Sequence, residues 1–140
     1  MYKRILVAIE NSDADRTILT HIRTLAKMCE AELLLVHVAD GWAARHFDEL
    51  KLRESEEMRA DREYLAQIQQ TLQGEGFTVR TLLAKGDPAT ELIRVSQAEH
   101  SDLIAMATHG HRFLADVVKG TTVDRVRHLV KIPVLLLRAQ

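Results

Sequence analysis

The sequence has little cysteine, no long apolar run and almost no net charge, and each absence excludes a class of protein. Its single cysteine, Cys29, can form neither an intrachain disulfide nor a cysteine-based metal cage, and its place on the apolar stripe of a predicted helix indicates a small core residue. No apolar run approaches the ~20 residues that span a bilayer, and no secretory segment precedes the first strand-like run. With a formal net charge of −1, the chain lacks the excess of positive charge that is typical of a nucleic-acid-binding protein. We therefore expect a cytoplasmic protein that binds neither membranes nor nucleic acid.

Two familiar nucleotide motifs and the usual catalytic sets are also missing. There is no Gly-x-x-x-x-Gly-Lys-Ser/Thr loop, and no Gly-x-Gly-x-x-Gly follows the first strand. No Ser-His-Asp or Cys-His set can be assigned. The pair His109-Gly-His111 has no carboxylate or cysteine at a recognisable spacing, so we do not predict a metal site built by the protein alone. It also differs from the His-x-Gly-His of nucleotidyl transferases, which belongs at the first strand–helix turn rather than after the fourth strand.

What is present is a regular alternation of apolar runs and amphipathic segments over 140 residues, which we expect to form one domain, residues 1–140. Continuous apolar runs typical of strands buried on both faces are separated by segments with helical spacing of apolar residues. This βαβαβαβαβ order predicts an α/β fold with a parallel sheet and helices on both faces. The predicted strands are 4–9, 33–38, 77–84, 102–106 and 134–138.

Local signals place the turns and helix starts. Ser12 followed by Asp15 resembles a capping box, and Asp87-Pro88 provides an N-cap residue and a proline at the first helical position. The charged segment 48–73 is predicted to be a helix with a solvated face, preceded by a loop over 40–47. Residues 77–84 are less hydrophobic than the other strands, which indicates a sheet edge.

The stretch from Met106 to Thr122 is the strongest candidate for a binding site. It runs from the end of the fourth strand through a loop into a helix, with Gly110 and Gly120 separated by nine residues. Glycine lets the backbone approach an anion, and a helix start offers unpaired N–H groups. In open parallel sheets, ligands bind beyond the carboxyl ends of the strands where the strand order reverses. We expect strand one, ending at Glu10, and strand four to flank such a crevice.

With these residues in place, the chain resembles the universal stress proteins of the UspA type over essentially its whole length. The matching segments, in order, are 5–12 (ILVAIENS), 35–38 (LVHV), 86–89 (GDPA), 102–110 (DLIAMATHG), 120–126 (GTTVDRV) and 133–138 (PVLLLR). The resemblance implies a Rossmann-like, adenine nucleotide alpha hydrolase-like fold with an open five-stranded sheet in the order 3-2-1-4-5.

The resemblance also implies a nucleotide site. Nucleotide-binding members carry Gly-x-x-Gly, nine residues, then Gly followed by Ser or Thr; this chain matches from Gly110 onward, with Ala107 in place of the first glycine. By resemblance, the phosphates are held by Gly110, Gly120, Thr121 and Thr122. Glu10 stands where an aspartate usually contacts the ribose, Asn11 replaces a common glycine, and the Val38 backbone would contact the adenine. The other expected site residues are Ala8, Ile9, Ser12, Met106, Ala107 and His109. The implied ligand is ATP, ADP or AMP, with Mg²⁺ or Mn²⁺ held by the phosphates.

Three functions remain open. The first is a stress-response regulatory protein whose bound nucleotide is recognised by partners. The second is a slow ATP hydrolase, in which Glu10 or His109 would position water. The third is an interaction module without nucleotide, suggested by Ala107 and Glu10. In each case we expect a homodimer formed through the apolar strand Val134–Leu137, since an exposed apolar edge needs a partner.

A few side chains near the predicted site have no decided role. His37 lies in a buried strand and is interpreted as a core histidine with its hydrogen bonds satisfied. Trp42 and Phe47 could cover the crevice or pack at a subunit contact. Arg112 and Lys119 could meet phosphate charge or lie in solvent.

Overall fold

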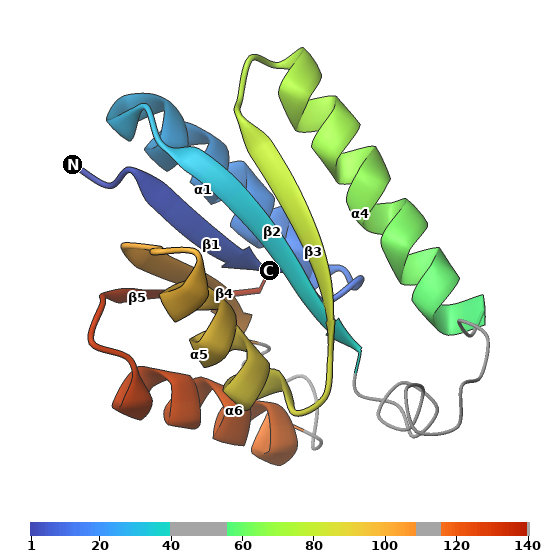
Figure 1. Ribbon diagram of the computed structural model, residues 1–140, viewed down its shortest axis with the longest axis vertical. Coiled ribbons are helices and arrows are strands. Elements are labelled where there is room, and N and C mark those ends of the chain that lie inside the picture. Colours follow the sequence, from blue (N-terminus) through green and yellow to red (C-terminus); the bar gives the residue numbers. More distant parts are fainter. Residues whose placement is uncertain (40–55, 109–115, 140) are drawn as a thin grey trace.

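A computed structural model of the chain describes residues 1–39, 56–108 and 116–139. Strands and helices alternate along the chain, as the apolar pattern predicts (Figure 1). In order they are β1 (Arg4–Ala8), α1 (Ala14–Cys29), β2 (Glu32–Ala39), α4 (Glu56–Gly74), β3 (Val79–Lys85), α5 (Pro88–Ala98), β4 (Leu103–Thr108), α6 (Asp116–Leu129) and β5 (Val134–Arg138).

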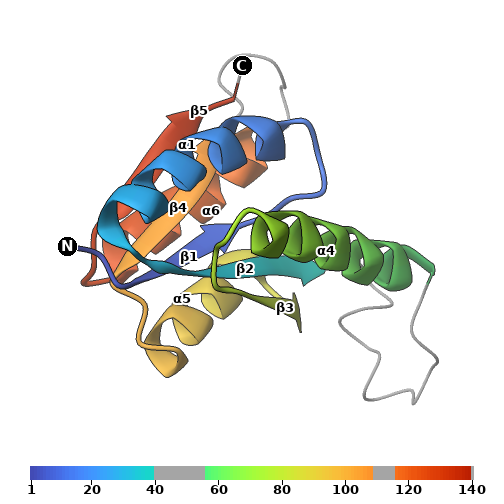
Figure 2. The same cartoon turned by 90° about the horizontal axis from the view of Figure 1, so that it is seen from above.

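The strands form one five-stranded parallel sheet in the order β3-β2-β1-β4-β5, which confirms the predicted fold. Its first strand pairs with β2 on one side and with β4 on the other. Helices cover both faces: α1 and α4 pack on one, and α5 and α6 pack on the other (Figures 1 and 2). The strand order therefore reverses at β1, between β2 and β4.

The central strands are buried on both faces, and their sequences accordingly show no alternation of polar and apolar residues. In β1, Ile5 and Val7 point to the layer of α1 and α4, whereas Leu6 points to the layer of α5 and α6, and all three are fully buried. This explains why residues 4–9 read as a continuous apolar run. The less hydrophobic β3 lies at a sheet edge, as predicted.

One helix start matches the sequence signals and two differ from them. The carboxylate of Asp87 accepts the Thr90 N–H, and Pro88 opens α5, as predicted. The first helix begins at Ala14, with Asp13 as an N-cap residue that makes no side-chain cap bond. The described part of the predicted helix 48–73 is α4, Glu56–Gly74; the predicted loop 40–47, with Trp42 and Phe47, lies outside the described residues. The last helix begins at Asp116, earlier than predicted.

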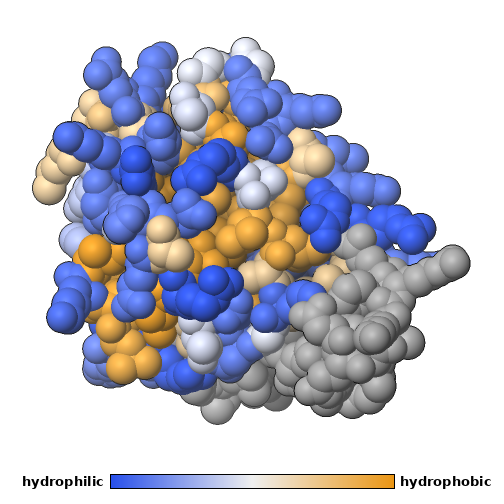
Figure 3. All heavy atoms as spheres, in the orientation of Figure 1, coloured by the Kyte–Doolittle hydropathy of each residue, from blue (hydrophilic) through white to orange (hydrophobic). Residues whose placement is uncertain are grey.

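The apolar surface includes the edge of the sheet formed by β5. Every residue from Val134 to Leu137 is half-buried in the single chain. Figure 3 shows apolar side chains gathered on the face that carries α5 and α6. The partly buried apolar residues of that face include Leu82, Ile93, Val130, Ile132, Val134 and Leu136. No helix in the described parts of the chain is both long and apolar enough to cross a membrane.

Candidate functional site

The carboxyl ends of β1 and β4 lie side by side, because these strands pair in parallel from Ile5 with Leu103 to Val7 with Ala105. Beyond β1, the chain continues one more residue along the sheet: the Ile9 N–H donates to the Val36 carbonyl at 2.8 Å. Glu10 follows, half-buried, at the start of the turn to α1. The structure thus brings the predicted residues of strand one next to those of strand four, at the reversal of strand order.

A buried carboxylate fills the turn between β1 and α1. Asp15 is 1% exposed and accepts the backbone N–H groups of Glu10 at 2.9 Å, Asn11 at 2.8 Å and Ser12 at 3.3 Å. The predicted pairing of Ser12 with Asp15 is present, since Asp15 accepts the Ser12 N–H and the Ser12 hydroxyl accepts the Ala14 N–H at 3.3 Å. The shorter bonds of Asp15 go to the two residues before Ser12. Successive backbone N–H groups converging on one carboxylate form the kind of concavity that otherwise binds an external anion. Here the chain's own side chain occupies it.

The phenol of Tyr64 on α4 donates a further hydrogen bond to Asp15, at 2.8 Å. Burial raises the pKa of Tyr64 far above its ordinary value, and the bonded carboxylate of Asp15 raises it further. The phenol therefore stays protonated and remains a donor at any physiological pH. The sequence reasoning missed this contact, which connects α4 to the first turn of the candidate site.

A second buried carboxylate, Asp61 on α4, holds the same turn from the other side. Its Oδ1 accepts the side-chain amide of Asn11 at 2.9 Å, and its Oδ2 lies 3.1 Å from His37 Nε2. The other ring nitrogen, Nδ1, lies 2.7 Å from the Ile9 carbonyl oxygen. His37 is thus a histidine with both ring nitrogens engaged, as the sequence analysis proposed. Asn11 adopts a φ of +62°, a conformation that asparagine tolerates better than most residues, which fits its place at a common glycine.

The predicted adenine and strand-four residues take regular strand positions. Val38 is half-buried near the end of β2, paired with Ala84 of β3. Met106 and Ala107 are 4% and 8% exposed near the end of β4. Ala107 does not have a positive φ and pairs with Leu137 in the sheet, so the alanine in the place of the first motif glycine is not strained.

The phosphate side of the site differs from the prediction in one respect. His109 and Gly110 lie outside the described residues, as does Arg112. Gly120, Thr121 and Thr122 lie inside α6, four or more residues after its start, rather than at the helix start. Backbone N–H groups beyond the first turn of a helix bond within the helix. An acidic residue such as Asp116 stabilises the first turn of a helix, and the sequence reasoning missed this signal.

The turn after β3 connects this end of the sheet to α6. Arg125 donates to Asp87 Oδ2 at 2.7 Å and to the Thr90 hydroxyl at 3.1 Å. The hydrogen bonds from Thr90, and next the bond and charge of Arg125, hold the pKa of Asp87 below its usual range. The ion pair is half exposed, so it positions α6 against α5 more than it stabilises the fold.

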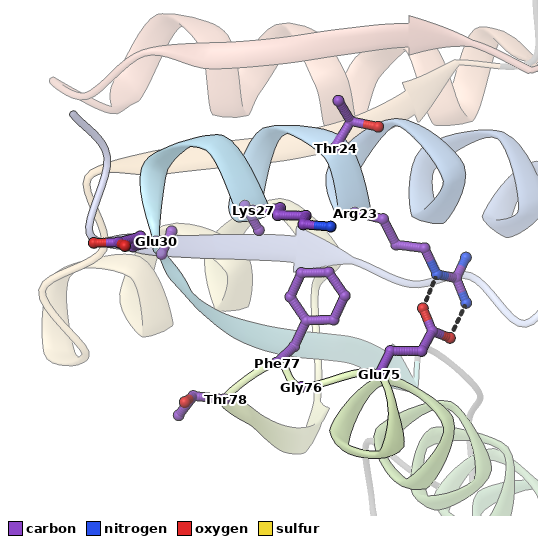
Figure 4. Close-up of a pocket in the computed structure, with 10 residues that line it drawn as sticks. Arg23, Thr24, Lys27, Glu30, Glu75, Gly76, Phe77 and Thr78 are labelled. Atoms are coloured by element: carbon purple, nitrogen blue, oxygen red, sulfur yellow. Dashed lines mark hydrogen bonds and ion pairs between the residues drawn. The ribbon is translucent and has the colours of Figure 1, made fainter.

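An open groove lies at the other end of the sheet and is separate from this site. It is formed by the last turns of α1 and the turn between α4 and β3, and Figure 4 shows the Phe77 ring beside Lys27 and the Arg23–Glu75 ion pair at its rim. Since β2 and β3 begin there, the groove is at the amino ends of the strands. Ligands of open parallel sheets bind at the opposite ends.

Comparison with known proteins agrees with this geometry. The sequence profile described as "Universal stress protein family" matches residues 1–138. The chain belongs to the universal stress protein family. A relative, universal stress protein MJ0577 of Methanocaldococcus jannaschii, is 25% identical over 158 residues, which cover 99% of this chain and 96% of the relative.

Solved structures agree on the fold of this universal stress protein. The structure of MJ0577 has a TM-score of 0.79 at 24% identity, covering 100% of this chain and 98% of that one. A universal stress protein in complex with cAMP has a TM-score of 0.71 at 15% identity, with 99% and 98% covered. One from Archaeoglobus fulgidus in complex with dAMP also has a TM-score of 0.71, at 17% identity, with 96% and 97% covered.

Proposed function

We propose that this protein is a stress-response regulatory protein that binds an adenine nucleotide at the carboxyl ends of β1 and β4. The observation that carries the proposal is the reversal of strand order at β1, with Glu10 after one strand and the segment that leads to Gly120 after the other. Family members with the same fold have been solved with cAMP and with dAMP, which supports an adenylate as the ligand class.

The filled turn after β1 supports different positions for the ribose and the phosphates of the ligand. Asp15 takes up the N–H groups of Glu10, Asn11 and Ser12, so this turn offers an incoming anion no free donors from those residues and a buried negative charge behind them. Phosphate is therefore disfavoured there. The Glu10 carboxylate is an acceptor that suits the hydroxyl groups of a sugar. The ribose belongs beside β1, and the phosphates belong on the β4–α6 side.

On the phosphate side, binding requires a local change in α6. Gly120, Thr121 and Thr122 can offer backbone N–H groups to phosphate only if the turn Asp116–Lys119 opens. A glycine inside a helix costs about 1 kcal/mol relative to alanine, so Gly120 makes this opening easier. In our proposal the nucleotide selects the opened form, and partners recognise the resulting surface.

The remaining predicted residues complete the site. Val38 contacts the adenine through its backbone, while Ala8, Ile9, Met106 and Ala107 form its floor and Ser12, His109 and Gly110 its rim. ATP is the proposed ligand in the cell, with ADP or AMP as alternatives. A Mg²⁺ or Mn²⁺ ion would be held by the phosphates.

Calorimetric titration with ATP and Mg²⁺, AMP and cAMP tests the proposal. We expect binding that weakens at least about tenfold in Gly120→Ala, because the variant stabilises the closed helix and adds a methyl group at the phosphates. Gly74→Ala, at the end of α4 where an added Cβ meets nothing within 4 Å, is the matched control. Absence of binding by all three nucleotides at millimolar concentration would exclude the proposed function.

The sheet edge favours a second, compatible proposal, assembly into a homodimer through β5. Val134–Leu137 end the sheet and remain half-buried in one chain, and pairing with a second copy would cover this apolar edge. Sedimentation at micromolar concentration should give about twice the chain mass. A monomer that persists at 100 times that concentration would contradict it.

A further inference from the structure

The contacts of His37 require one more proton than a neutral histidine and an ionised aspartate contain together. A carbonyl oxygen only accepts hydrogen bonds, so the 2.7 Å contact with the Ile9 oxygen requires a proton on His37 Nδ1. The Asp61 carboxylate also only accepts, so the 3.1 Å contact with Nε2 requires a second proton between the two groups. Without it, a lone pair would face a carboxylate oxygen.

This proton lies in a largely buried environment. The side chains of His37 and Asp61 are 14% and 8% exposed. A buried carboxylate persists when it is paired and hydrogen-bonded, and Asp61 has the imidazole on one oxygen and the Asn11 amide on the other. The shared proton therefore compensates the charge of Asp61 as well as making the bond.

The described partners of the imidazole come from two elements. Ile9, beyond β1, offers its carbonyl oxygen, and Asp61 on α4 offers its carboxylate. On β3, the residue beside His37 is the apolar Leu83, and the cation Lys85 lies two residues further along, beside Ala39. The carboxylate of Asp61 is therefore the charged group that the structure places against the ring.

The two groups that this pair holds belong to the residues on either side of the proposed ribose residue, Glu10. His37 fixes the carbonyl of Ile9, Asp61 fixes the side chain of Asn11, and Glu10 lies between them. We propose that the proton shared by His37 and Asp61 fixes the segment Ile9–Asn11, and that a variant without the imidazole releases the segment and binds the nucleotide more weakly. His37 is thus a positioning residue, and the part of this inference that concerns affinity rests on the proposed function.

The substitution Asp61→Asn keeps the hydrogen bond to His37 but removes the need for the extra proton. In Asp61→Asn, the side-chain amide can donate to the unprotonated Nε2 of a neutral His37, while its carbonyl oxygen accepts from Asn11. The link then forms without the extra proton. His37→Gln, in contrast, removes the ring and its bond to Asp61. His21→Gln, an exposed histidine on α1, is the matched control.

The test combines NMR of the imidazole nitrogens with AMP titrations. The His37 signals are identified by their loss in His37→Gln, and we expect both ring nitrogens to carry protons in the wild type but only Nδ1 in Asp61→Asn. AMP affinity should fall about tenfold in His37→Gln. It should stay within about twofold of the wild type in His21→Gln and in Asp61→Asn.

The two proposals fail in distinguishable ways. A wild-type His37 ring with a proton on one nitrogen alone would overturn the inference, as would wild-type AMP affinity in His37→Gln. If the wild type did not bind AMP, the proposed function would fail for this ligand. The backbone amide signals of Ile9 to Asn11 would then decide the inference by themselves, since they should shift in His37→Gln and not in His21→Gln.

Discussion

Replacing Asp15 with asparagine tests whether a single buried carboxylate organises the first turn of the site. The side chain keeps its shape, but one of its two acceptors becomes a donor. Oδ2 accepts from Asn11, Ser12 and Tyr64, so the oxygen of asparagine would occupy that position and the amide would face the Glu10 N–H. Two donors then face each other in a site that is 1% exposed.

The size of the expected loss in the free energy of unfolding follows from these contacts. An unsatisfied buried N–H costs about 1–3 kcal/mol, and the other three bonds change from charged to neutral acceptance, which weakens them further. We expect the free energy of unfolding to fall by about 2–4 kcal/mol in total. With a urea dependence of about 2 kcal/mol per molar, the unfolding midpoint would fall by about 1–2 M.

Urea unfolding followed by circular dichroism measures this midpoint, and Asp13→Asn is the control. Asp13 is exposed, makes no side-chain cap bond and carries the same charge two residues away. Its substitution should change the free energy of unfolding by less than about 1 kcal/mol. A midpoint for Asp15→Asn no lower than that of Asp13→Asn would refute the assignment of Asp15 as the anion that fills this turn.

Three further substitutions test other parts of the structure by the same unfolding measurement. The pKa of Tyr64 is raised in the folded protein, so its contribution to the free energy of unfolding is present below the ordinary tyrosine pKa of about 10 and is lost as the pH rises through the higher folded value. Tyr64→Phe should therefore flatten the alkaline decline in stability. An equally steep decline in the variant would contradict this. The lowered pKa of Asp87 gives the opposite sign: its contribution is present above about pH 4 and is lost on acidification. Asp87→Ala should cost about 1 kcal/mol at neutral pH through the lost N-cap, and no cost would exclude the cap as a stabilising contact. Leu35→Ala, at a fully buried position of β2, should cost about 2–5 kcal/mol, and a cost below about 1 kcal/mol would show that the core there can collapse.

The strands could be predicted because their apolar runs are a direct consequence of burial on both faces. The runs 4–9 and 33–38 match β1 and β2 within two residues at each end, since their apolar residues face the two helix layers. Strand order followed from family resemblance rather than from the residues alone. The start of α6 was placed too late because the glycines were weighed more heavily than Asp116, an acidic residue that suits the first turn of a helix.

The polar network around the first turn could not be derived from spacing, since its members are distributed over positions 15, 37, 61 and 64. A local signal nevertheless existed. Asp15 falls at helical spacing with Ile18, Leu19 and Ile22 on α1, and Asp61 falls between Met58 and Leu65 on α4. A carboxylate on an apolar stripe must find partners in the core, because its isolated charge would be costly there. Which partners it finds depends on tertiary packing.

The departures from the family pattern in the first turn are best understood as a coupled set. Asn11, where a glycine is common, accepts the left-handed conformation and also supplies an amide to Asp61. Asp61 in turn needs the His37 proton to balance its charge, and His37 holds the carbonyl that precedes Glu10. Each residue of this set therefore has a polar group that the next residue satisfies. Glu10, whose carboxylate reaches one methylene further than the usual aspartate, is presented by a turn that two carboxylates, a tyrosine and a histidine hold in place. In the proposed site, its longer side chain would therefore change the reach to the ribose.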